Sequence, residues 1–173
     1  MKITENFLDD KTFDSIKKQL TQKAGYFEWF FNDVTSPKTD SIDEFQFCHM
    51  LYDGSPRARY DLIKPLVDKI DPFTLVRVKA NLITRTHKIK EYTLHKDFEY
   101  GNLTTAIFYI NTCNGYTLFE NGEKVNSVEN RLVEFDSFLL SKNKTALFIL
   151  IIEIISSELS LKKILLLLIL IFF

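Results

Sequence analysis

The feature that most constrains the fold is a series of three short strand-like segments in the second half of the chain. They span residues 104–111, 116–119 and 131–135, and are rich in the β-branched and aromatic residues that favour extended structure. Asn114-Gly115 and Asn121-Gly122 lie between them. Asn-Gly is the pair that tight hairpin turns prefer, because both turn positions take positive φ. Short strands joined by tight turns predict an antiparallel sheet.

Two amphipathic helices are expected before these strands. Asp9 or Asp10 can cap the first, which runs to about residue 23 with apolar residues at helical spacing. The second runs from Pro56 to residue 70, and Pro65 should kink or split it. Further extended segments are expected at residues 26–31, 44–52 and 75–84. This order predicts an α+β, mainly β domain: a double-stranded β-helix, or jelly roll, with N-terminal helices packed on one sheet.

Length and charge restrict the class of protein. A chain of 173 residues predicts one domain with a proper core. A net charge of −1 gives no basic surface of the kind that nucleic-acid binding needs. Cys48 and Cys113 have no metal-binding spacing, and they favour a reducing compartment. The first ten residues contain no apolar stretch typical of a secretory signal. We therefore expect a cytoplasmic protein.

His95 and Asp97 form the first candidate site. They lie two residues apart just before the strand series, and side chains at i and i+2 of an extended segment point the same way. Both could therefore reach one metal ion. Two histidines and one carboxylate on one face of Fe(II) leave three positions open, which is the ligand set of non-haem oxygenases. The pair alone also fits a solvated surface turn.

The residues around this pair resemble the prolyl-4-hydroxylase-like branch of the 2-oxoglutarate/Fe(II) dioxygenases, including relatives from marine phages and bacteria. The likeness covers about residues 75–137. It is carried by four blocks in the family's order: His95-Lys96-Asp97, the strand TAIFYIN from Thr105 to Asn111, GYTLF from Gly115 to Phe119, and NRLVEFDS from Asn130 to Ser137.

This resemblance implies the site and the reaction. His95 and Asp97 match iron ligands, and Tyr109 matches a tyrosine that in some relatives binds the distal carboxylate of 2-oxoglutarate. The implied cofactor is Fe(II), the implied cosubstrates are 2-oxoglutarate and O₂, and ascorbate is an accessory reductant in the family. The implied activity is hydroxylation of a small molecule or a peptide, with peptidyl proline as the best-known substrate.

The chain departs from the family after Ser137. No histidine follows His95 and no arginine follows Arg131, so the second metal histidine and the 2-oxoglutarate-binding arginine are absent. We therefore expect impaired or absent turnover. The alternatives are a non-catalytic remnant and a membrane-tethered binding module. His87 is the candidate to replace the missing metal histidine. His49 is expected to be a packed or surface residue.

The strand at residues 75–84 adds three polar side chains that would line the barrel. Arg77, Lys79 and Asn81 could face substrate or cosubstrate, but we expect a solvated strand face.

The composition changes near residue 141. The last ten residues are apolar without interruption, about half of the roughly 20 that a membrane helix needs. The run 146–173 is consistent with core strands or a buried helix, with a membrane tether, or with translation out of frame. The sequence thus divides into residues 1–72 (helices and first strands), 73–137 (jelly-roll core with a partial metal site) and 138–173 (aberrant tail). We expect the last jelly-roll strands to be missing or replaced, and the tail to pack poorly.

Overall fold

The computed structural model describes residues 1–21, 27–33, 45–85, 87, 90–96, 103–139, 141–145 and 149–157. Two helices and a series of short strands make up this part of the chain. In chain order they are β1 (Lys2–Thr4), α1 (Asp10–Thr21), β2 (Phe30–Asn32), β3 (Gln46–Asp53), α2 (Tyr60–Ile70), β4 (Thr74–Ile83), β5 (Lys90–Glu91), β6 (Thr104–Tyr109), β7 (Tyr116–Phe119), β8 (Lys124–Asn126), β9 (Arg131–Asp136), β10 (Ser141–Thr145) and β11 (Ile149–Ser157).

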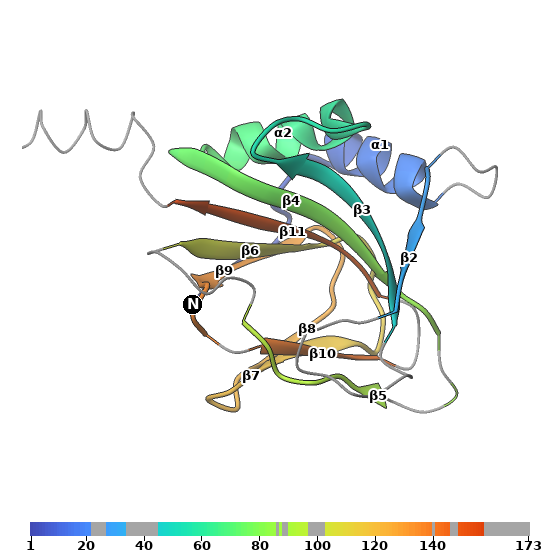
Figure 1. The fold of residues 1–173 in the computed structure, drawn as a ribbon, viewed down its shortest axis with the longest axis vertical. Coiled ribbons are helices and arrows are strands. Elements are labelled where there is room, and N and C mark those ends of the chain that lie inside the picture. The colour runs from blue at the N-terminus through green and yellow to red at the C-terminus, as the bar shows by residue number, and fades with distance from the viewer. Residues whose placement is uncertain are drawn as a thin grey trace, which may run out of the picture.

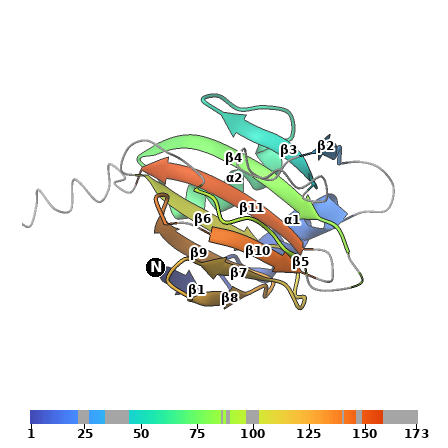
Figure 2. The same cartoon turned by 60° about the horizontal axis from the view of Figure 1, so that its bottom comes forward.

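The strands form two facing sheets (Figure 1). The larger sheet has seven strands in the order β1-β9-β6-β11-β4-β3-β2, and the smaller has four in the order β5-β10-β7-β8. Every pairing is antiparallel. Strands β1 to β4 all belong to the larger sheet, and from β4 to β11 the chain passes back and forth between the sheets, with β7 and β8 adjacent in the smaller one. Figure 2 shows β11 lying between β4 and β6. This is the jelly roll, and the predicted fold class is confirmed.

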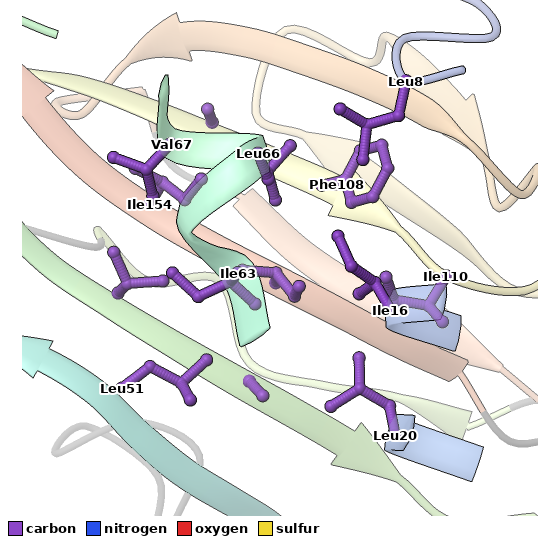
Figure 3. Close-up of a cluster of buried hydrophobic side chains, with 14 of the residues drawn as sticks. Leu8, Ile16, Leu20, Leu51, Ile63, Leu66, Val67, Phe108, Ile110 and Ile154 are labelled. Carbon is purple, nitrogen blue, oxygen red and sulfur yellow. The ribbon is translucent and has the colours of Figure 1, made fainter. Parts of the chain in front are cut away.

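The helices cover the outer face of the larger sheet and create the main core (Figures 1 and 3). Ile16 of α1 and Ile63 of α2 are buried against Phe108 of β6 and Ile154 of β11. A second buried cluster lies on the other face, between the sheets, and it includes Tyr109. Because side chains alternate along a strand, β4, β6 and β9 each contribute residues to both clusters. One face of the larger sheet therefore packs against the helices, and the other faces the smaller sheet.

The predicted helices are confirmed with two corrections, the first being that α2 begins at Tyr60 and not at Pro56. Helix α1 begins at Asp10, where the Asp9 carboxylate accepts a hydrogen bond from the Thr12 backbone at 3.0 Å and so caps the first turn. Helix α2 continues through Pro65 to Ile70, so the predicted split is wrong. The burial of its apolar face, with Ile63 and Leu66 fully enclosed, outweighs the loss of one backbone hydrogen bond at proline.

The expectation for the tail is corrected over residues 141–157. Strand β10 pairs with β5 and β7, and β11 lies between β4 and β6 in the middle of the larger sheet. Ile152, Ile154 and Ile155 are completely buried, so the last strands are present and β11 packs tightly. Residues 158–173 lie outside the described part of the chain. No helix among the described residues is both long enough and apolar enough to cross a bilayer.

Asn130, in the turn before β9, hydrogen-bonds the N-terminal segment through its side chain. Its side-chain amide donates to the Leu8 carbonyl at 2.8 Å and its side-chain oxygen accepts from the Leu8 N–H at 2.9 Å. The residue is buried and has a φ of 60°, a conformation that asparagine tolerates better than most residues.

We expect Asn130→Ala to lower the free energy of unfolding by about 3 kcal/mol, because two buried hydrogen bonds are lost and alanine is strained at positive φ. Urea denaturation measures the change. The control is Asn126→Ala on β8, whose side chain is exposed, and it should change stability by less than about 0.5 kcal/mol. Equal effects of the two substitutions would contradict the role given to Asn130.

Candidate functional site

The structure places His95 on the inner face of the smaller sheet. His95 and Ser141 exchange both backbone hydrogen bonds, at 3.1 and 3.0 Å, and Ser141 is paired with Phe119 of β7. Phe119 belongs to the cluster between the sheets. Residues directly opposite each other in an antiparallel pair share a face, so His95, Ser141 and Phe119 form one row that faces the larger sheet.

The imidazole of His95 is oriented by a backbone contact. Its Nδ1 lies 3.0 Å from the carbonyl oxygen of Thr93. A carbonyl only accepts hydrogen bonds, so Nδ1 must carry the proton, and the lone pair of the neutral ring is then on Nε2. Metal-binding histidines are commonly held in this way, with one ring nitrogen donating to a carbonyl and the other facing the metal. His95, half-buried on the inner face, therefore fits a metal ligand.

In the described part of the chain, no other predicted metal ligand lies beside His95. Asp97 lies outside this part. In the part of the chain that the structure describes, no three His, Cys, Asp or Glu side chains gather as a metal-binding group. His87 is exposed. His49 is buried among aromatic rings, with its ring nitrogens 2.7 and 3.2 Å from the carbonyl oxygens of Glu28 and Ala58. It is a packed residue, as the sequence suggested.

Tyr109 lies between the sheets, at the end of β6. It is fully buried in the inner cluster, and its hydroxyl is 2.6 Å from Oγ1 of Thr117 on β7. This hydrogen bond therefore links the larger sheet to the smaller sheet. Burial raises the pKa of the Tyr109 phenol, and the hydrogen bond with Thr117 opposes this only in part. The phenol is a neutral hydrogen-bond donor at physiological pH.

This raised pKa predicts a loss of stability in alkaline solution. A buried neutral phenol contributes fully below about pH 10, where an unfolded tyrosine is also neutral, and the contribution falls as the pH rises further because only the unfolded chain ionises readily. We expect Tyr109→Phe to lower stability at pH 8 by about 1 kcal/mol through the lost hydrogen bond. Between pH 8 and pH 11, Tyr109→Phe should lose less stability than the wild type loses. The remaining tyrosines are common to both proteins, so an equal alkaline loss would contradict the assignment.

Three polar residues of β4 also face the space between the sheets. Val78 and Ala80 are buried under the helices, so Arg77, Lys79 and Asn81 lie on the opposite, inner face. Asn81 is only 4% exposed and the two basic side chains are half-buried. The expected solvated strand face is therefore wrong for Asn81. The alternation of the strand was visible in the sequence, but the presence of a second sheet over this face was not.

Comparison with known proteins supports the fold. No protein-family model matches the sequence, and no curated protein does. A prolyl-4-hydroxylase from Pseudomonas putida superposes with a TM-score of 0.61 at 12% identity, over 90% of this chain and 91% of that chain. A Trichoplax adhaerens prolyl hydroxylase, solved with a hypoxia-inducible-factor peptide fragment, superposes with a TM-score of 0.61 at 14% identity. The superposition covers 91% of this chain and 83% of that chain.

A third solved structure extends the comparison beyond prolyl hydroxylases. The epimerase SnoN, in complex with Fe³⁺, α-ketoglutarate and a nogalamycin compound, superposes with a TM-score of 0.63 at 10% identity, over 90% of this chain and 78% of that chain. Likeness at such low identity concerns the fold, and chemistry has to be argued from the site.

Proposed function

We propose that the chain is an Fe(II)/2-oxoglutarate-dependent dioxygenase by descent, with weak metal binding and impaired turnover in its present sequence. The observation that carries the proposal is the position of His95. It is held by Thr93 on the inner row of the smaller sheet, and Tyr109 lies within the same space between the sheets. The solved structures with this fold include prolyl hydroxylases and an enzyme crystallised with Fe³⁺ and α-ketoglutarate.

Each residue has a defined task in this proposal. Nε2 of His95 and the carboxylate of Asp97 hold the metal, and the neutral Tyr109 hydroxyl donates a hydrogen bond to the cosubstrate. Bound iron, with 2-oxoglutarate and O₂, supplies the oxidising chemistry. The apolar residues around Tyr109, such as Ile107 and Val133, exclude water. The substrate is a small molecule or a peptide, and ascorbate would serve as an accessory reductant. The competing proposal is a remnant with the same fold and no turnover.

Metal titration followed by single substitutions tests the proposal. We expect Fe(II) to bind weakly under anaerobic conditions, and His95→Ala to abolish the binding because the imidazole on the inner row of the smaller sheet is removed. His87→Ala is the matched control, since this side chain is exposed. Metal affinity that is unchanged by His95→Ala would refute the site.

Turnover is measured as succinate formed from 2-oxoglutarate. We expect little or none above background. Rapid succinate formation that His95→Ala removes would show that another residue completes the site, and His87 would then be the next residue to replace.

A further inference from the structure

His49 makes two contacts that a neutral imidazole cannot satisfy together. Its Nδ1 lies 2.7 Å from the carbonyl oxygen of Glu28, and its Nε2 lies 3.2 Å from the carbonyl oxygen of Ala58. Both partners only accept hydrogen bonds. A neutral imidazole has one N–H donor and one lone pair, whereas the imidazolium has two N–H donors. Only the protonated ring can therefore donate to both carbonyls.

The two carbonyls belong to different parts of the structure. Glu28 lies in the segment 27–32, which ends in β2, the last strand in the order of the larger sheet. Ala58 lies just before α2. His49 is on β3, which pairs with β2 (Figure 1), and the residue is only 4% exposed. Its imidazole thus connects segment 27–32 to the start of a helix through a buried contact.

The surroundings of His49 accommodate a positive charge. Burial disfavours a charged ring, but the rings of Phe27 and Phe30 lie 4.7 and 5.5 Å from the imidazole, measured between centroids, and aromatic rings attract cations. The Glu28 carboxyl has a lowered pKa, caused mainly by its hydrogen bond from Arg59 and to a smaller extent by the charge of His49. Glu28 is therefore ionised throughout the range in which histidine ordinarily titrates.

The elements around His49 carry several other charged side chains in the described part of the chain. They are Lys18 in the last turn of α1, Asp33 after β2, Asp53 and Arg57 in the turn before α2, Asp61 in the first turn of α2, and Lys79 on β4. Aspartate, lysine and arginine ordinarily change charge outside the range from about pH 5 to about pH 8. Histidine is thus the type of residue that titrates within this range here.

We propose that His49 is a pH-sensitive clamp that holds segment 27–32 against the start of α2 when its imidazole is protonated and loosens the segment when the imidazole is neutral. As the pH rises from about 5 to about 8, one of the two contacts is lost. The contact with Ala58 is the longer one, so the neutral ring keeps its N–H on the Glu28 side. The pair formed by Glu28 and Arg59 remains, but it is exposed and such pairs stabilise little.

Fluorescence of the full-length chain tests the inference, because Trp29 is the only tryptophan and it packs on Phe27 at 4.8 Å within the same segment. We expect its emission maximum to move to longer wavelength as the pH rises from about 5 to about 8. Amides of segment 27–32 should exchange with solvent about fivefold faster at the higher pH, after correction for the intrinsic pH dependence of exchange, as one lost hydrogen bond implies.

Substitution assigns the transition to one residue. His49→Gln keeps an N–H donor but does not titrate, so it should remove the pH dependence of the Trp29 emission. The matched control replaces the other two histidines of the chain, His87 and His95, by glutamine together, and it should retain the transition.

Two fluorescence results would overturn the inference: an emission maximum of the wild type that stays constant between about pH 5 and about pH 8, or a transition that persists in a folded His49→Gln protein. If His49→Gln does not fold, nitrogen NMR of the His87/His95 double variant decides, since His49 is then the only histidine. We expect two protonated ring nitrogens at the low pH and one at the high pH. A His49 ring that is neutral at both would refute the clamp.

Discussion

Replacing Ser141 by histidine is expected to raise the affinity of the chain for Fe(II) by at least about a hundredfold, equivalent to about 2.7 kcal/mol. Ser141 is the residue directly opposite His95, joined to it by two backbone hydrogen bonds. Opposed residues have Cβ atoms about 5 Å apart on the same face, so under the proposed function an imidazole there would reach a metal held by Nε2 of His95. If Asp97 is the carboxylate ligand as proposed, the variant would have two histidines and one carboxylate for the metal.

The experiment is an anaerobic Fe(II) titration of the wild type and three variants. Ser141→Asp supplies a smaller ligand and should raise the affinity to a lesser extent. Ser141→Leu fills the buried position without a donor atom and should bind no better than the wild type. Combining Ser141→His with His95→Ala should cancel the gain. A Ser141→His protein that is folded by circular dichroism and has wild-type affinity would show that the two positions do not share a metal.

Substitution of Ile154 by aspartate is expected to abolish cooperative folding. Ile154 is completely buried in the core under the helices (Figure 3), on the central strand β11. An unpaired carboxylate there costs more than about 4 kcal/mol, which is comparable to the total stability of about 5–15 kcal/mol of a typical domain. The protein should lose its sharp thermal transition.

Ile154→Val is the conservative control, with an expected cost of about 1 kcal/mol. A second control, Ser157→Asp at the half-buried end of the same strand, should fold normally. Both are measured by thermal and urea unfolding. A cooperative Ile154→Asp protein would mean that β11 is not the central strand of the sheet, and the tail would then be dispensable for the fold. Resequencing codons 137–173 would test independently whether this tail is translated out of frame.

Much of the fold was predictable because the signals for it are local. The cap at Asp9 and the apolar spacing of α1 predict a helix from neighbouring residues alone, and Asn121-Gly122 predicts the turn between β7 and β8. The prediction of a tight turn at Asn114-Gly115 is wrong, because β6 and β7 belong to different sheets. Alternation along β4 showed which of its residues share a face. What alternation could not show is whether the polar face meets water or another sheet. That depends on β7 and β10, which lie far along the chain, so the burial of Asn81 required the structure.

His95 and Tyr109 were proposed as site residues from the sequence alone, since short motifs around each one carry the resemblance. The sequence also determined that no later histidine completes the ligand set. The tertiary structure decided which residue lies opposite His95: Ser141, on a strand that the sequence assigned to an aberrant tail. It decided as well that β11 is central and buried. An apolar run fits a strand, a buried helix or a membrane segment equally well, and only its hydrogen-bonded pairing with β4 and β6 distinguishes them.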